Sequence, residues 1–409
     1  MDKETVENIY KHFRYRFFKL SILPAFLGLL LIFTPITLDY QDTQVILSER
    51  ICGSLLIFLA ILSFRVRAVL WVGVFIGIWV TWFACYPERS SLVFANDTLL
   101  GFAILALVCI PPTRPDALEV GPTLPEGIAY NPSAGGRRAA VLFLSLLGWL
   151  QSRYLTASLL GISSEKFDCD NQIYTVMMIT YSILVVLALS GGERRWHTRP
   201  KIVLATACAL IVVVISSLWS IIQGDIRFDC WICLCLAVEP AFAVVFAYDE
   251  ILATSKYLAQ FSKDKKNLLK TALLGSEYYR DSLFWEERTV LPFGKACQQA
   301  FRGISFPLHR LAAIVLTFTF VKMNYGMALS NGARSYINIC GWFIIVLSII
   351  SFAESLRHFR WLCLIFSIAI LLSPVVFHLP LHAPMLIPTI FTGIALVFLS
   401  IGKISPQKK

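Results

Sequence analysis

The chain has 409 residues, of which 57% are hydrophobic and 15% charged, and its mean hydropathy is +0.69. This composition excludes a soluble globular protein, because a single core could not bury so much apolar surface. The net charge of +10 does not indicate nucleic-acid binding, since the Lys and Arg residues lie in short segments between apolar runs, where they act as topology signals.

A membrane-spanning helix needs about 20 mostly apolar residues, and the sequence supplies such runs one after another. We therefore predict an all-α, polytopic membrane protein with about twelve transmembrane helices. The first run follows a long charged leader and is long enough to span, so we expect an anchor and not a cleaved signal peptide. The predicted helices are Leu20–Leu38, Ile46–Phe64, Ala68–Tyr86, Leu92–Ile110, Ala139–Gly161, Ile173–Ser190, Ile202–Gly224, Cys230–Ile251, Leu308–Ser330, Tyr336–Leu356, Trp361–Leu379 and Met385–Gly402.

Positive charge marks every second connection between these helices, which predicts that both termini are cytoplasmic. The opposite connections are rich in Asp and Glu, and they are predicted to face outward, across a bacterial inner membrane into the periplasm. The basic residues of the predicted cytoplasmic side include Lys11, Arg14, Arg65, Arg67, Arg137, Arg138, Arg194, Arg195, Lys263, Lys270, Arg357, Arg360, Lys408 and Lys409.

An internal repeat defines the organisation of the chain. The segment from Ile51 to Phe64 echoes the segment from Ile339 to Phe352, and Gly101 and Gly393 occupy matching places in the last helix of each copy. Between the copies lies a different four-helix unit. The predicted domains are 1–110 and 307–409 as two copies of a four-helix module, 111–138 as a cytoplasmic Pro/Gly-rich linker, 139–254 as the central unit and 255–306 as a basic cytoplasmic segment.

The most chemically suggestive motif is Cys230-Trp231-Ile232-Cys233, a CxxC pair at the start of the eighth predicted helix. Eleven cysteines would produce one CxxC by chance in roughly one chain in four, so the spacing alone is weak. The charge pattern, however, places this pair at the outer face of the membrane. A dithiol there can exchange electrons with outer proteins and with a carrier dissolved in the lipid.

The central unit resembles the vitamin K epoxide reductase family, in which four helices surround a quinone and a CxxC opens the fourth helix. Flanking segments resemble a longer bacterial subgroup, and the outer modules resemble SPW-repeat membrane segments. The residues that carry the central resemblance are Gly148 to Thr156, Ala205 to Ala207, Ser216 to Leu218 and Cys230 to Leu234. The flanking residues are Gly121-Pro122, Pro125 to Gly127, Tyr130 to Ser133, Arg195 to Pro200 and Asp249-Glu250, and the outer modules carry Phe94 to Thr98 and Leu372 to Pro374.

The resemblance implies a fold and a reaction. The fold is a four-helix, quinone-reductase-like bundle, and the reaction is oxidation of protein dithiols by ubiquinone or menaquinone. Cys233, one turn deeper, would face the quinone, and Trp231 could shield that thiol. Cys230 would exchange disulfides with a separate periplasmic thioredoxin-like protein. The oxidising periplasm suits the disulfide product.

Cys169 is the candidate shuttle thiol in the outer loop after the fifth predicted helix. Most members of the family carry two cysteines in this loop, and this chain has one. A lone thiol can form only a transient bridge to Cys230. The alternative interpretation of Cys169 is an inert surface thiol.

Glu239 lies near the predicted middle of the bilayer, beside Pro240. An acid at that depth is a functional candidate, because its burial costs several kcal/mol unless it is neutral or paired. Glu239 is therefore a candidate proton relay to the quinone. The alternative is a protonated side chain bonded across the bundle.

Other polar segments carry weaker predictions. The basic segment 255–306 mixes Lys with Leu, which suits a helix on an anionic membrane surface or a solvated topology determinant equally well. His378 and His382 flank Pro380, which breaks helical spacing, so no metal site is expected. The alternative to the redox enzyme is a non-catalytic membrane scaffold, or a transport or assembly component, that retains the fold without the full cysteine relay.

Overall fold

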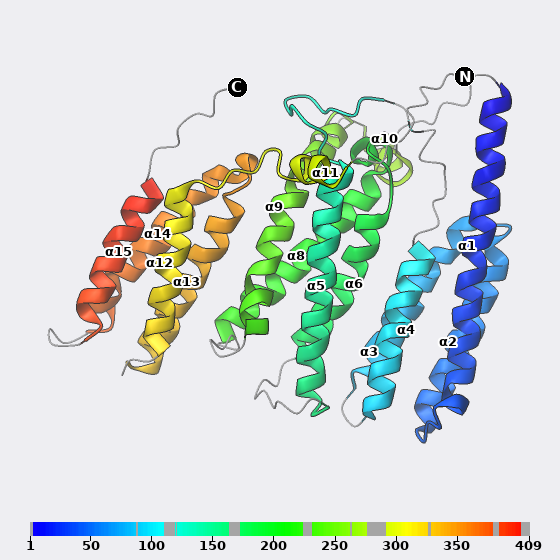
Figure 1. Ribbon diagram of the computed structural model, residues 1–409, viewed down its shortest axis with the longest axis horizontal. Coiled ribbons are helices and arrows are strands. Elements are labelled where there is room, and N and C mark those ends of the chain that lie inside the picture. Colours follow the sequence, from blue (N-terminus) through cyan, green and yellow to red (C-terminus); the bar gives the residue numbers. More distant parts are fainter. Residues whose placement is uncertain are drawn as a thin grey trace. The chain divides into compact units, whose positions relative to one another are not determined.

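A computed structural model of the chain describes residues 3–86, 89–109, 119, 121–162, 172–223, 231–261, 264–275, 292–325, 329–378 and 384–401. Within these ranges the protein is built from helices and contains no strand (Figure 1). The prediction of an all-α protein is therefore confirmed for this part of the chain.

Each of the twelve predicted segments contains helix, and their order follows the chain. The helices are α1 (Lys3–Thr37), α2 (Thr43–Ser63), η1 (Arg67–Val72), α3 (Gly73–Ala84), α4 (Ser91–Cys109), α5 (Gly135–Leu159), α6 (Ile173–Leu189), α7 (Arg195–Thr198), α8 (Pro200–Gln223), α9 (Trp231–Ala259), α10 (Lys265–Leu274), α11 (Phe293–Ala300), α12 (Leu308–Tyr325), α13 (Asn331–Ile350), η3 (Glu354–Phe359), α14 (Arg360–Val376) and α15 (Leu386–Ile401).

Six of the described helical stretches are long and apolar enough to cross a membrane, which indicates a multi-pass membrane protein. Large apolar side chains also lie on the outside of the helices, as Phe26 and Phe33 of α1 do at 54% exposure. Such a surface suits lipid and not water. The six stretches are Thr43–Ser63, Ser91–Val108, Pro200–Gln223, Trp231–Ala259, Asn331–Ile350 and Glu354–Val376. The number of twelve spans stays a prediction.

Most helix boundaries differ by a few residues from the predicted ones, and larger differences occur at η1, α1 and α9. The predicted helix Ala68–Tyr86 is split into the 3₁₀ segment η1 and the twelve-residue α3, because Val66 offers no capping side chain and a first turn without a cap often tightens into 3₁₀ geometry. Helix α1 begins at Lys3, within the charged leader. Helix α9 continues past Ile251 to Ala259, because Thr254 and the residues around it pack against protein groups.

The chain divides into two compact units, each described by itself. One unit contains Met1–Val213 with Glu250–Ala300, and the other contains Val214–Asp249 with Phe301–Lys409. The division falls within α8 and α9, and the separate four-helix unit 139–254 therefore stays a prediction.

The N-terminal module, α1 to α4, packs through small residues. A Cβ atom at Gly53 of α2 would lie 2.5 Å from the Gly28 carbonyl oxygen of α1, so only glycine permits this close approach. Apolar side chains of α1 to α4 then fill the core beside it, among them Leu31, Leu56 and Ile104.

The C-terminal module, α12 to α15, has the same order of elements. Two helices, a 3₁₀ segment and two further helices follow one another in both modules. Its core contains Phe320 of α12, Ile344 of α13 and Leu396 of α15.

Candidate functional site

Cys233 lies in the first turn of α9 and is buried, at 4% exposure. It begins a buried stripe along this helix that contains Leu236, Pro240, Ala243 and Ala247. These residues recur at three- and four-residue spacing, so they share one face. A thiol buried in this way is out of reach of the surface of a folded protein.

Trp231 lies at the start of α9, with 71% of its surface exposed. Two residues apart on an α-helix differ by about 200° in direction, so Trp231 and Cys233 lie on opposite sides of α9. The predicted shielding of Cys233 by Trp231 does not fit this arrangement.

Glu239 is buried in α9, at 4% exposure. It follows Cys235 by four residues and therefore shares a face with Cys235. Cys233 lies six residues earlier and points about 120° away from Glu239 around the helix. Two residues before Glu239, the Ala237 carbonyl oxygen accepts a hydrogen bond of 2.9 Å from Ser217 of α8. Pro240 has no N–H to offer the helix, and the carbonyl oxygen that it would have bonded is that of Leu236, so the Ser217 bond is made to the neighbouring carbonyl.

The other predicted thiols of the site, Cys230 and Cys169, lie outside the described residues. Four further cysteines, Cys52, Cys85, Cys340 and Cys363, are buried and pack as small apolar side chains. Cys208 and Cys235 are exposed, and packing inside the protein does not account for them.

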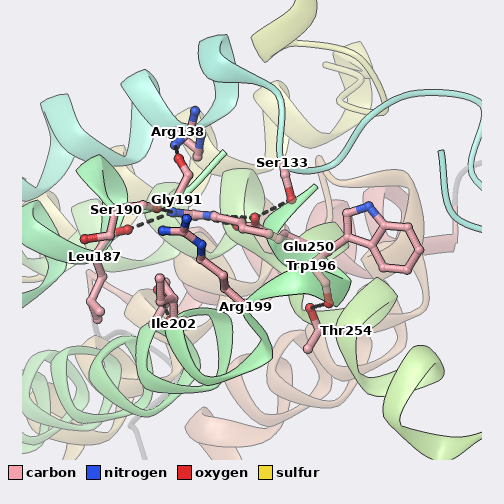
Figure 2. A network of polar contacts seen from close by, with 12 residues as sticks. Ser133, Arg138, Leu187, Ser190, Gly191, Trp196, Arg199, Ile202, Glu250 and Thr254 are labelled. Atoms are coloured by element: carbon pink, nitrogen blue, oxygen red, sulfur yellow. Dashed lines mark hydrogen bonds and ion pairs between the residues drawn. The ribbon is translucent and has the colours of Figure 1, made fainter. Parts of the chain in front are cut away.

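Among the described residues, a dense polar network surrounds Arg195 and Glu250, as Figure 2 shows. The guanidinium of Arg195 binds both carboxylate oxygens of Glu250 at 2.6 Å, and its third nitrogen donates to the carbonyl oxygens of Leu187 and Ser190. Ser133 donates a further bond of 2.6 Å to Glu250. Both charged side chains are at least 96% buried.

This network joins three distant segments of the chain. Ser133 precedes α5, Arg195 opens the short helix α7, and Glu250 lies in α9. A paired, bidentate arrangement is the form in which buried charges are tolerated. Because Glu250 already accepts three hydrogen bonds, the network acts as a structural clamp that holds α9 and not as a reactive centre.

A second set of contacts fixes the α6–α8 connection. Arg199 pairs with Glu119 at 2.9 Å, Arg194 donates to the Gly121 carbonyl oxygen, and Thr254 donates to the Trp196 carbonyl oxygen. Most of these segments belong to the flanking residues that carry the resemblance to the longer bacterial subgroup. The sequence did not show that they lie together. The signal that could have revealed the clamp is the presence of charges of opposite sign, Arg194-Arg195 and Asp249-Glu250, beside apolar helices.

His197 belongs to this connection and lies 3.1 Å from the Pro122 carbonyl oxygen through Nε2. A carbonyl only accepts, so Nε2 carries the proton of the neutral ring. Burial, opposed by the bond to Pro122 and assisted by the neighbouring Arg194, lowers the pKa of His197 to about 4.

The lowered pKa of His197 predicts a dependence of stability on pH. An unfolded His binds a proton below about pH 6.5, whereas the native ring stays neutral down to about pH 4. Stability is therefore complete above pH 6.5 and falls as the pH drops toward 4, by up to about 3 kcal/mol. Thermal unfolding in detergent between pH 7 and 4 measures this loss. His197→Gln should flatten the curve, and an unchanged pH dependence in this variant would contradict the assignment.

Comparison with known proteins gives no relative: no protein-family model, curated protein or solved structure matches the chain.

Proposed function

We propose that this protein is a membrane thiol-disulfide oxidoreductase of the vitamin K epoxide reductase type, which passes electrons from outer protein dithiols to a membrane quinone. The observation that carries the proposal is the burial of Cys233 in the first turn of α9, a helix apolar enough to span a membrane. Cys230 directly precedes this helix in the sequence.

The reaction balances as a two-electron transfer. The two thiols of Cys230 and Cys233 form an S–S bond and give up two electrons and two protons. Ubiquinone or menaquinone takes up two electrons and two protons and becomes the quinol. A reduced outer protein of the thioredoxin type then attacks the disulfide, leaves with its own disulfide and restores the dithiol.

Within this proposal, Cys233 reacts with the quinone and Cys230 exchanges with the protein partner. Cys169 shuttles electrons to Cys230, and Glu239 supplies protons to the reduced quinone. The burial of Cys233 supports this division of labour, because a buried thiol is out of reach of a folded partner. The charge pattern of the sequence supports cytoplasmic termini and a bacterial inner membrane, with the dithiol on the periplasmic side.

The proposal is tested by assaying quinone reduction. We expect the purified protein, reconstituted in lipid vesicles, to reduce ubiquinone or menaquinone when a small dithiol is supplied, at a rate well above that of protein-free vesicles. Heat-unfolded protein in the same vesicles is the control for unspecific thiol chemistry. Equal rates with and without folded protein, for both quinones, would favour the non-catalytic scaffold.

A further inference from the structure

Two carboxyl side chains, Glu49 of α2 and Asp97 of α4, meet inside the N-terminal module. Each is 2% exposed, and each lies on a helix of membrane-spanning length. Each also lies six residues into its helix, or roughly 9 Å from the helix start. Burying two acids together is costly unless they are neutralised.

Asp97 is held by two hydrogen-bond donors. Asn96 donates to its Oδ1 atom at 2.9 Å, and the Tyr40 hydroxyl donates to the same atom at 3.3 Å. Tyr40 lies in the turn before α2, where burial, together with the charge of the neighbouring Asp97 carboxylate, raises its pKa. Its hydroxyl therefore remains protonated and keeps its role as a donor, and Asp97 has the surroundings of a carboxylate.

Glu49 has different surroundings. Among the described residues, no protein donor reaches either of its buried carboxyl oxygens, and its carboxyl lies within hydrogen-bond reach of Asp97. Two carboxylates offer only acceptors, so a hydrogen bond between them requires a proton on one of the two. Because Asp97 already has donors and Glu49 lacks one, the proton belongs on Glu49.

Neighbouring arginines are engaged by other groups. Arg153 of α5 donates to the Thr98 hydroxyl and to the Ala95 carbonyl oxygen of α4. Arg89 pairs with Asp42 at the start of α2. The groups that act on the carboxyl pair are thus Tyr40 and Asn96, neither of which carries a positive charge.

The C-terminal module has the same order of helices as the N-terminal module, and it has no acid at the positions that match Glu49 and Asp97. In the register that matches Cys52 with Cys340 and Gly101 with Gly393, Glu49 corresponds to Ile337 and Asp97 to Thr389. Both of these residues are fully buried, at 0% exposure. Uncharged side chains therefore fill the same positions, so the acids of the first module serve something other than packing.

We propose that Glu49 and Asp97 form a proton-binding site in the N-terminal module. Glu49 holds one proton and shares it with the Asp97 carboxylate, and the Tyr40 hydroxyl links the pair to the adjoining turn, through which the proton exchanges with water. On release, the O–H bond of Glu49 breaks and the proton passes to solvent. The site is independent of the thiol chemistry proposed above.

Infrared spectroscopy of the full-length protein in lipid tests the site without any redox turnover. At neutral pH we expect the carbonyl band of one protonated carboxylic acid that shifts in D2O and disappears in Glu49→Gln. Asp39→Asn, which removes an exposed carboxyl from the neighbouring turn, is the matched control and should retain the band. The double variant Glu49→Ile, Asp97→Thr copies the C-terminal module, so it should fold and lack the band.

Two results would overturn the proposal. One is that both Glu49 variants keep every protonated-acid band of the wild-type protein. The other is a band that vanishes when sodium replaces potassium at constant pH, since the pair would then bind a metal cation and not a proton.

Discussion

Replacing Arg195 by Met is expected to lower the free energy of unfolding by about 3 to 5 kcal/mol, because the change leaves the buried carboxylate of Glu250 without its partner. It also removes the donors from the Leu187 and Ser190 carbonyl oxygens. Unfolding of the purified protein in detergent, followed by circular dichroism, measures the loss.

A double-variant cycle separates pairing from packing. Arg195→Met combined with Glu250→Leu should cost less than the sum of the two single changes, because no uncompensated charge remains. The matched surface control is Glu354→Gln, whose partner Arg357 lies at 3.2 Å in a partly exposed pair. That change should cost less than about 1 kcal/mol. Equal losses at both pairs would show that Arg195 and Glu250 do not form a clamp.

Replacing Cys233 by Ala is expected to reduce dithiol-driven quinone reduction to the rate of protein-free vesicles. The change removes the sulfur that would react with the quinone and leaves an apolar side chain of similar size in a buried position. Cys235→Ala is the matched control, because it alters an exposed cysteine two residues further along α9 and should retain the activity. Unfolding temperatures of both variants equal to that of the wild-type protein would exclude a folding defect.

The same Cys233 variant should also capture the protein partner. With Cys233 absent, the thiolate of Cys230 can attack the disulfide of an oxidised outer protein, which releases one partner thiol and leaves a mixed disulfide that Cys233 can no longer resolve. Non-reducing electrophoresis should then show a covalent adduct that disappears in the Cys230→Ala, Cys233→Ala double variant. Full activity of Cys233→Ala would remove this thiol from the mechanism.

The sequence predicted the helices well because apolar runs bounded by charge, Pro or Gly leave few alternatives. Boundaries were harder to predict, since they depend on tertiary contacts. The end of α9, for example, was predicted at Ile251, shortly after Asp249 and Glu250, but Glu250 is paired inside the protein and the helix continues to Ala259.

The polar clusters could not be predicted from spacing alone. Arg195 and Glu250 are 55 residues apart, and no local pattern indicates their pairing. Glu49 and Asp97 were likewise hidden, because each is a single acid in an apolar helix. The internal repeat was the useful signal, since Ile337 and Thr389 occupy the matching positions of the other module. That Cys230, Cys233 and Cys169 form one relay stays a prediction, because Cys230 and Cys169 lie outside the described part of the chain.

The central claim concerns the dithiol at the start of α9, and a thiol count under strictly anaerobic conditions tests it most directly. The fully reduced protein, which has eleven cysteines, is mixed with one equivalent of menaquinone or ubiquinone, alkylated and analysed by mass spectrometry. We predict that two thiols become protected, both in the peptide that contains Cys230 and Cys233, as one equivalent of quinol appears. Eleven alkylated thiols and unreduced quinone, with both quinones, would contradict the claim.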